Sequence, residues 1–234
     1  MIRKSWLENR SSRERTGEAG TELYGEICPE NRGIFRFEVI GRGMRAHSGV
    51  SGIGPDLTDR LLAARTEIES ILNTRLTLNS PDGWKSQVRF PYIQVGVPGI
   101  YNVTANLGLF GVEVRLIPQD DISPLLEELG EYCAKQELKL NIPVKENGIA
   151  CDPANPYLKA LLKSVKQVSR QDPRLGRKLP ATSARFAPGG QGVVWGQTGI
   201  GPHSLDERHY LPSILPFYQV LHAWGEELLE LKTR

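Results

Sequence analysis

The sequence predicts a mixed α/β protein, and three observations support this prediction. Alternating or continuous runs of apolar, β-branched and aromatic residues indicate strands at 34–40, 88–95, 101–117 and 138–144. Apolar residues at helical spacing indicate helices at 56–72 and 122–136. The elements from residue 33 to residue 144 thus follow the order strand, helix, strand, strand, helix, strand. This order is the split βαβ of a ferredoxin-like two-layer sandwich.

Each of these helices has two capping candidates before its apolar stripe. Asp56 or Thr58 is expected to cap the first helix, and Asp121 or Ser123 the second. The residues expected to face the core are Leu57, Leu61, Leu62, Ile68, Ile71 and Leu72, then Leu125, Leu126, Leu129 and Tyr132. A Gly/Pro turn at 96–99 joins the two middle strands into a hairpin or meander. The sandwich is left with one bare sheet face or edge that a second subunit can use.

The rest of the chain divides around this sandwich. Asn147-Gly148 and Cys151-Asp152-Pro153 mark a domain junction, which gives three expected segments, 1–32, 33–145 and 146–234. A helix begins at Pro156, a strand is expected at Val193-Val194-Trp195, and a final helix covers 212–231. The apolar face expected on that final helix is Ile214, Leu215, Tyr218, Leu221, Leu228 and Leu231.

Composition restricts the class of partner and the compartment. Twenty-nine basic and 27 acidic residues are spread along the chain and leave a net charge of +2, so no basic face indicates nucleic acid or a membrane surface. Cys28, Cys133 and Cys151 have no CxxC spacing, which argues against a disulfide framework and against a Cys-rich zinc site. No apolar run is long enough to span a bilayer. We therefore expect a cytoplasmic protein that binds a small molecule.

Three titratable residues stand where a strand meets a turn. His203 lies in the Gly/Pro-rich stretch 199–209, His47 precedes a Gly-rich turn, and Glu26 follows a strand end. Each has a structural alternative. His203 fits a loop that caps the final helix, His47 fits a surface histidine bonded to its own loop, and Glu26 fits a solvated turn carboxylate. Asn102 and Arg115 likewise fit the exposed face of a sheet.

Four segments, in chain order, resemble a family of zinc-dependent metallohydrolases. That family includes aminoacylase, glutamate carboxypeptidase, acetylornithine deacetylase and succinyl-diaminopimelate desuccinylase. The resemblance runs from about Tyr24 to the C-terminus, and its segments are Gly25-Glu26, Ala46-His47-Ser48, Tyr101-Asn102-Val103 with Glu113-Val114-Arg115, and residues 201–207. It implies part of a zinc-peptidase-like catalytic α/β domain, into which the ferredoxin-like sandwich is inserted as a lid and dimerisation domain.

The resemblance also implies roles for single residues. Glu26 and His203 would be zinc ligands, at a site that holds two zinc ions in the family and that cobalt or manganese can also occupy. His47 would donate to the oxyanion across a homodimer formed through the lid. Arg115 with Asn102 would anchor a substrate carboxylate. Arg185 would be a further substrate contact, although its segment, Ser183-Ala184-Arg185-Phe186, lacks the aspartate of the family pattern.

One departure from the family limits the expected function. The family's His-x-Asp pair, bridging aspartate and Glu-Glu pair are missing, since no histidine precedes His47 and the first aspartate is Asp56. The pairs Glu127-Glu128 and Glu226-Glu227 lie within amphipathic helices. We expect a truncated amidohydrolase or peptidase of N-acyl amino acids or small peptides, without turnover alone. The alternatives are a non-catalytic dimerisation or binding module, and a separate chain that supplies the missing ligands.

Overall fold

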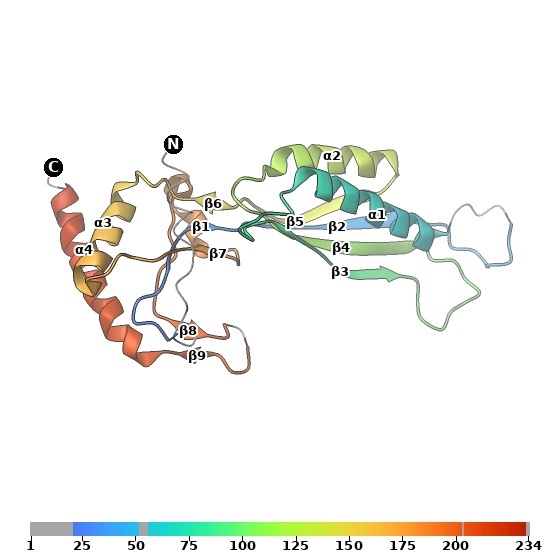
Figure 1. Cartoon of the computed structure of the whole chain (residues 1–234). Helices are drawn as coiled ribbons and strands as arrows, with labels where there is room; N and C mark the ends of the chain where they lie inside the picture. Colours follow the sequence, from blue (N-terminus) through green and yellow to red (C-terminus); the bar gives the residue numbers. More distant parts are fainter. Residues whose placement is uncertain (1–20, 52–55, 203, 233–234) are drawn as a thin grey trace. The chain divides into compact units, whose positions relative to one another are not determined.

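The computed structural model describes residues 21–51, 56–202 and 204–232. The chain divides into two compact units. The first unit consists of Met1–Ile27, Pro153–Leu175 and Trp195–Arg234, and the second of Cys28–Asp152 and Gly176–Val194. The chain therefore enters and leaves the second unit twice (Figure 1).

The second unit contains a four-stranded antiparallel sheet with two helices on one face (Figure 1). The strands lie in the order β3-β4-β2-β5, and α1 and α2 cover the sheet. In chain order the elements are β2 (Ile34–Arg42), α1 (Leu57–Arg75), β3 (Gln87–Val95), β4 (Leu107–Arg115), α2 (Ile122–Lys135) and β5 (Lys139–Glu146). This arrangement confirms the predicted α/β class and its ferredoxin-like sandwich.

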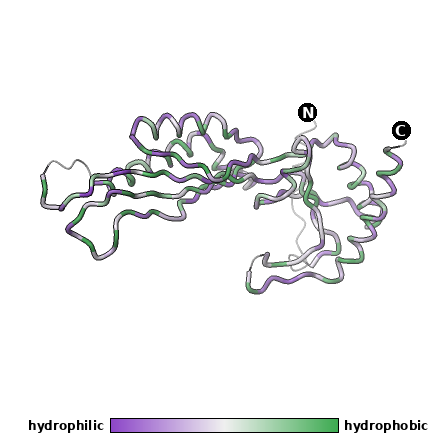
Figure 2. The backbone as a smooth tube through the Cα atoms, turned by 180° about the vertical axis from the view of Figure 1, so that it is seen from behind, coloured by the Kyte–Doolittle hydropathy of each residue, from purple (hydrophilic) through white to green (hydrophobic). Residues whose placement is uncertain are grey.

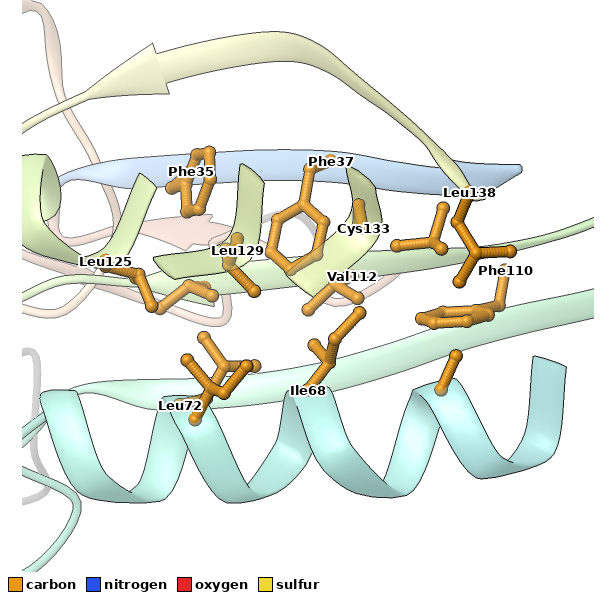
Figure 3. Packing of buried hydrophobic residues seen from close by; sticks show 14 of the residues in the cluster. Phe35, Phe37, Ile68, Leu72, Phe110, Val112, Leu125, Leu129, Cys133 and Leu138 are labelled. Carbon is orange, nitrogen blue, oxygen red and sulfur yellow. The ribbon is translucent and has the colours of Figure 1, made fainter. Parts of the chain in front are cut away.

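The core of this unit lies between the helices and the sheet. Phe35 and Phe37 project from the central strand β2 with their ring centroids 4.9 Å apart. Figure 3 shows these rings facing residues of α1, α2 and β4. The largest fully buried side chains of this core include Phe110, Leu61, Ile68, Leu72, Leu116, Ile122, Leu125 and Leu129. Polar and apolar residues alternate along the helices and strands, as expected for elements with one buried side (Figure 2).

The helix caps resolve both of the alternatives left open by the sequence. The carboxylate of Asp56 accepts from the Thr58 amide at 2.7 Å, and that of Asp121 accepts from the Ser123 amide at 2.9 Å. The aspartate is thus the cap of each helix.

One residue of the predicted helix stripes is exposed, and two are only partly buried. Leu62 is 47% exposed, whereas the preceding Leu61 is 0% exposed, because one residue turns the side chain by about 100° around a helix. Leu126 and Tyr132 are partly buried and pack against the core, and Cys133, which was not predicted, is a further buried residue of α2. The prediction that Leu62 faces the core was therefore wrong, whereas Leu126 and Tyr132 do pack against the core.

A second sheet has the strand order β6-β1-β7, formed by β1 (Ile27–Asn31), β6 (Ile149–Ala150) and β7 (Leu175–Lys178). The strand predicted at 193–195 is absent from it. Val194 makes one bridge, to Cys28, with hydrogen bonds of 2.8 and 3.0 Å. On β1, only Glu30 and Asn31 pair with β6, so the backbone of Cys28 is available to pair with Val194.

The first unit contains α3 (Pro156–Ser169) and α4 (Ile214–Lys232). α3 begins at Pro156, as predicted, and Asn155 caps it. The first unit also contains the hairpin β8 (Gly199–Ile200) with β9 (Arg208–His209) and the short helix η4 (Leu211–Ser213), whereas the short helices η2 (Ser183–Phe186) and η3 (Pro188–Gly190) belong to the second unit. No helix in the described ranges is both long enough and apolar enough to cross a membrane.

The apolar face predicted for α4 is mostly exposed within this unit. The exposed members are Ile214, Leu215, Tyr218, Leu221 and Leu231. Val220, which the prediction did not include, is fully buried. α4 packs mainly against α3, and one helix covers only one side of its neighbour. Most of the apolar face predicted for α4 is therefore exposed to solvent in this chain.

The neighbouring residues Leu61 and Leu62 provide a matched test of the core. Leu61→Ala is expected to lower the free energy of unfolding by about 2–5 kcal/mol, because it leaves a cavity between α1 and the sheet. Leu62→Ala is expected to change it by less than about 1 kcal/mol, because its side chain is half exposed. Denaturant unfolding followed by circular dichroism measures both, and equal losses would contradict this packing.

Candidate functional site

Of the two predicted metal ligands, the structure describes Glu26, which belongs to the first unit. Glu26 is exposed and follows Gly25, whose carbonyl accepts from Trp195 Nε1 at 3.2 Å. His203 lies outside the described residues. The hairpin on either side of it is described, with Gly199 paired to His209 and Ile200 paired to Arg208.

Within the ranges that the structure describes, no three or more His, Cys, Asp or Glu side chains gather as a metal would require. The described donors therefore do not amount to a zinc site. The ligand roles of Glu26 and His203 stay predictions, as do the metals zinc, cobalt and manganese.

His47 and Asn102 lie together at one end of the four-stranded sheet. We call this end the tip, formed by residues 43–51 and 96–106, two loops that extend from the same end of the sheet (Figure 1). His47 bridges to Val103, and the Ser48 amide donates to the Asn102 carbonyl at 3.0 Å. Thr104 joins the same two loops, since its amide donates to the Ala46 carbonyl at 2.9 Å. The tip is thus held by its own backbone hydrogen bonds.

The imidazole of His47 is exposed and has a defined orientation. Its Nδ1 accepts from the Gly49 amide at 3.1 Å. A neutral imidazole whose Nδ1 accepts carries its proton on Nε2. Nε2–H is therefore the donor that His47 can offer to a ligand.

The tip also exposes several large apolar side chains. Tyr101 is 91% exposed, and the others are Met44, Val50, Val97 and Ile100. Apolar side chains gathered at such density on a loop surface are typical of an interaction site.

Arg115 lies at the opposite end of the sheet. We call this end the base, where β4 ends at Arg115 and β2 begins at Ile34. Arg115 Nε donates to Glu113 Oε1 at 2.9 Å, and Arg36 Nε donates to Glu113 Oε2 at 2.7 Å. β4 runs over eight steps from Leu107 to Arg115, or about 27 Å along an antiparallel strand.

The bridging carboxylate of Glu113 has a shifted pKa. Burial by itself raises the pKa of Glu113, but the hydrogen bond from Arg36 and the charges of Arg115 and Arg36 outweigh burial. The pKa of Glu113 is therefore lowered from its ordinary value, and the carboxylate stays charged at neutral pH.

Arg185 belongs to the base, on the short helix η2. Its Nη1 donates to the Thr182 carbonyl at 2.8 Å, and its Nε lies 3.5 Å from Glu146 Oε2. Glu146 pairs with Ile34 at the start of β2, one residue before Phe35, which pairs with Val114. The structure thus groups Arg185 with Arg115 at the base, and it groups Asn102 with His47 at the tip.

A cluster around Trp84 escaped the sequence analysis. Trp84 is 7% exposed, and the guanidinium groups of Arg32 and Arg177 lie 5.3 and 5.2 Å from its ring centroid. Arg177 forms ion pairs with Asp82 at 2.5 Å and with Glu30 at 3.3 Å. Hydrogen bonds from Ser80 and Arg177 lower the pKa of Asp82. Arg32, Trp84 and Arg177 are far apart in the sequence, so no local pattern connects them.

The three cysteines are free and buried. Burial raises the pKa of the Cys133 thiol to about 11 and also raises that of Cys151. These two thiols are therefore protonated at neutral pH and are poor nucleophiles.

No family of known proteins and no curated protein matches this sequence. Solved structures do match its fold. An aminopeptidase PepT from Bacillus cereus is 14% identical with a TM-score of 0.62, and the match covers 97% of this chain and 62% of that one. An M20 family metallo-carboxypeptidase from Sulfolobus solfataricus is 14% identical with a TM-score of 0.60, covering 87% and 59%.

A putative aminohydrolase from methicillin resistant Staphylococcus aureus is also 14% identical, with a TM-score of 0.68, covering 91% of this chain and 56% of that one. The chain thus spans somewhat more than half the length of each of these three proteins. At this level of identity the likeness shows a shared fold.

The Arg36–Glu113–Arg115 bridge predicts a pH dependence of stability. A carboxylate with a lowered pKa stabilises the fold above its unfolded pKa of about 4.3 and stops doing so as the pH falls through the lowered folded value. Glu113→Gln is thus expected to cost about 1 kcal/mol at pH 7, because the bridge is partly exposed, and less at pH 3.

Urea unfolding at both pH values measures this difference. Glu131→Gln, at an exposed position of α2, is the control and is expected to match the parent chain at pH 7. A cost of Glu113→Gln that grows toward pH 3 would contradict the assignment.

Proposed function

We propose that this chain forms the lid, the substrate-binding arginines and part of the catalytic unit of a metal-dependent hydrolase. Its substrates would be N-acyl amino acids or small peptides. Two findings support the proposal: four segments resemble that family in chain order, and a metallo-carboxypeptidase and an aminopeptidase share the fold. Membership of the family is part of the proposal.

The main observation behind the proposal is the separation of the two pairs of substrate residues. His47 and Asn102 lie at the tip, whereas Arg115 and Arg185 lie at the base, about 27 Å away along β4. One small substrate does not span both ends of a single sheet. We therefore propose a homodimer in which the tip of one subunit completes the site of the other.

The exposed apolar residues of the tip fit this proposal. Tyr101, Val97 and Met44 belong to the same two loops as His47 and are exposed in the single chain. Burial of such side chains against a second subunit would stabilise the dimer by about 25 cal/mol for each Å² removed from water. The same contact would bring His47 to the partner's site.

The proposed chemistry assigns one task to each pair. His47 would donate its Nε2–H to the oxyanion that forms as the amide is attacked. Arg115 would bind the substrate carboxylate with the nitrogen that Glu113 leaves available, and Arg185 would be a further contact. Glu26 and His203 would bind the metal together with further ligands, since the described residues by themselves do not gather a set of three.

Residues 1–234 would not turn over on their own under this proposal. They contain no His-x-Asp pair, and their Glu-Glu pairs lie within the helices α2 and α4. Without those ligands and a base, a metal-bound water would be neither formed nor deprotonated efficiently.

Subunit complementation tests the proposal. The chain is assayed for hydrolysis of N-acyl amino acids with zinc, cobalt or manganese, alone and together with the product of the upstream reading frame. We expect no turnover alone and turnover with that product. In the presence of the upstream product, His47→Ala and Arg115→Ala should each be inactive. A mixture of the two variants should recover about a quarter of the activity of the parent chain. This fraction follows because half of the randomly mixed dimers would hold one intact site of two.

Two outcomes would contradict this proposal. A mixture of the two variants that stays inactive would show that His47 and Arg115 do not act across a dimer. Turnover by residues 1–234 alone that His203→Ala removes would show that these residues hold a complete site. His222→Ala is the matched control, because His222 is an exposed histidine of α4.

A second candidate function is a non-catalytic dimerisation module built from the same sandwich. The observation that favours it is the edge strand β3, in which Tyr92 and Ile93 are exposed. This hypothesis needs a dimer but no substrate.

Sedimentation velocity of the single chain distinguishes the two candidates further. We expect a dimer at tens of micromolar, and we expect Tyr101→Ser at the tip to weaken it more than Ile93→Ser on β3. The reverse order would favour the edge-strand module, and a monomer at this concentration would argue against both interfaces.

A further inference from the structure

The arginines that are at least partly buried at the base have carboxylate partners, with one exception. The pairs are Arg115 with Glu113, Arg177 with Asp82 and Glu30, and Arg185 with Glu146. Arg32 is the exception, because it has no carboxylate partner among the residues that the structure describes. It is also the most buried of the four, at 7% exposed.

The position of Arg32 is determined by its backbone and by one aromatic ring. Its amide donates to the Lys178 carbonyl at 3.1 Å, and its guanidinium carbon lies 5.3 Å from the centroid of Trp84. Its Nε is buried and has no hydrogen-bond partner within the described part of the chain. A buried donor without a partner costs free energy, so it requires an explanation.

Arg32 also lies close to a second positive charge. The next residue, Gly33, donates its amide to the Leu116 carbonyl at 2.7 Å, which places Arg32 beside the end of β4. Burial, and then the charge of Arg115, lower the pKa of Arg32. An arginine stays protonated in proteins even so, and the two guanidinium groups repel each other. A bound anion would offset this repulsion.

We propose that Arg32 and Arg115 together bind one carboxylate of the substrate. The inference deepens the proposed function and rests on it for the identity of the ligand. Glu113 occupies Nε and Nη2 of Arg115, which leaves Nη1, and the Nε of Arg32 makes no hydrogen bond within the described part of the chain. Two guanidinium groups from neighbouring segments can then hold both oxygens of a carboxylate. Arg32 replaces Asn102 as the residue that shares the carboxylate with Arg115 in the same subunit.

The contacts of Trp84 distinguish a binding role of Arg32 from a purely structural one. Arg177 contacts the same ring at the same distance, and its charge is already neutralised by Asp82 and Glu30. A structural stack on Trp84 thus exists without Arg32. Arg177 is consequently a matched control for a variant of Arg32.

Calorimetric titration of residues 1–234 tests the inference without any need for turnover. The probes are N-acetylglycine, which has a carboxylate, and its neutral analogue N-acetylglycinamide. We expect saturable binding of the first probe only, weakened about tenfold or more by Arg32→Met, since charge-assisted hydrogen bonds are the stronger class. Arg177→Met should retain binding and lower the melting temperature, because it leaves Asp82 and Glu30 without their cation.

Arg32→Met should keep or raise the melting temperature, because it removes an unpaired buried charge. If this variant does not fold, Arg32→Lys is titrated instead. It keeps the charge but loses the fork of donors, so binding should still weaken. Unchanged binding in the folded Arg32 variant, equal binding of the two probes, or tighter binding of inorganic phosphate than of N-acetylglycine would each overturn the inference.

Failure of this inference and failure of the proposed function give different results. If the His47 and Arg115 variants complement each other but the Arg32 variant binds N-acetylglycine unchanged, the carboxylate site at Arg32 is overturned and the proposed hydrolase function stands. If N-acetylglycine binding depends on Arg32 but no condition gives hydrolysis, the carboxylate site stands and the proposed hydrolase function is overturned.

Discussion

The central position of β2 in its sheet is the constraint on which the rest of the second unit depends. β2 pairs with β4 on one side and with β5 on the other, and its inward residues Phe35, Phe37 and Val39 are almost completely buried. A strand held on both edges and by its core face does not slip, because a shift of one residue would turn every apolar side chain to the solvent. The ends of β2 therefore set the positions of the candidate site residues, with Arg32 before it and His47 after it.

The open face of the same sheet is polar and linked from strand to strand. Tyr92 of β3 donates to Glu38 of β2 at 2.7 Å, and Asn141 of β5 donates to the same carboxylate at 2.8 Å. Tyr92 reaches across Gly111 of β4, where a Cβ atom would lie 2.5 Å from its ring. This face is thus unlike an apolar docking surface, which leaves the tip and the edge strand as the places for a second subunit.

The sequence predicted helices and strands well where one face of an element packs against a neighbour within the same unit. The order of elements from 33 to 144, the start of α3 at Pro156 and the two aspartate caps depend on local patterns, which the chain carries wherever it folds. The exposed face of α4 and the single bridge at Val194 depend on whether a partner surface is present. Periodicity identifies an apolar face, but it does not identify what covers that face.

The sequence by itself determined the class of fold, the polar residues at turns and the resemblance that assigned their roles. Only the tertiary structure decided which of these residues meet, because strand pairing and sheet register bring together positions that are far apart in the chain. It placed Asn102 beside His47 rather than beside Arg115, since the loops of the tip share backbone hydrogen bonds. It also buried Arg32 against Trp84 with no carboxylate partner among the residues that the structure describes. No sequence pattern indicates this, because the charge balance of a buried group depends on neighbours in space.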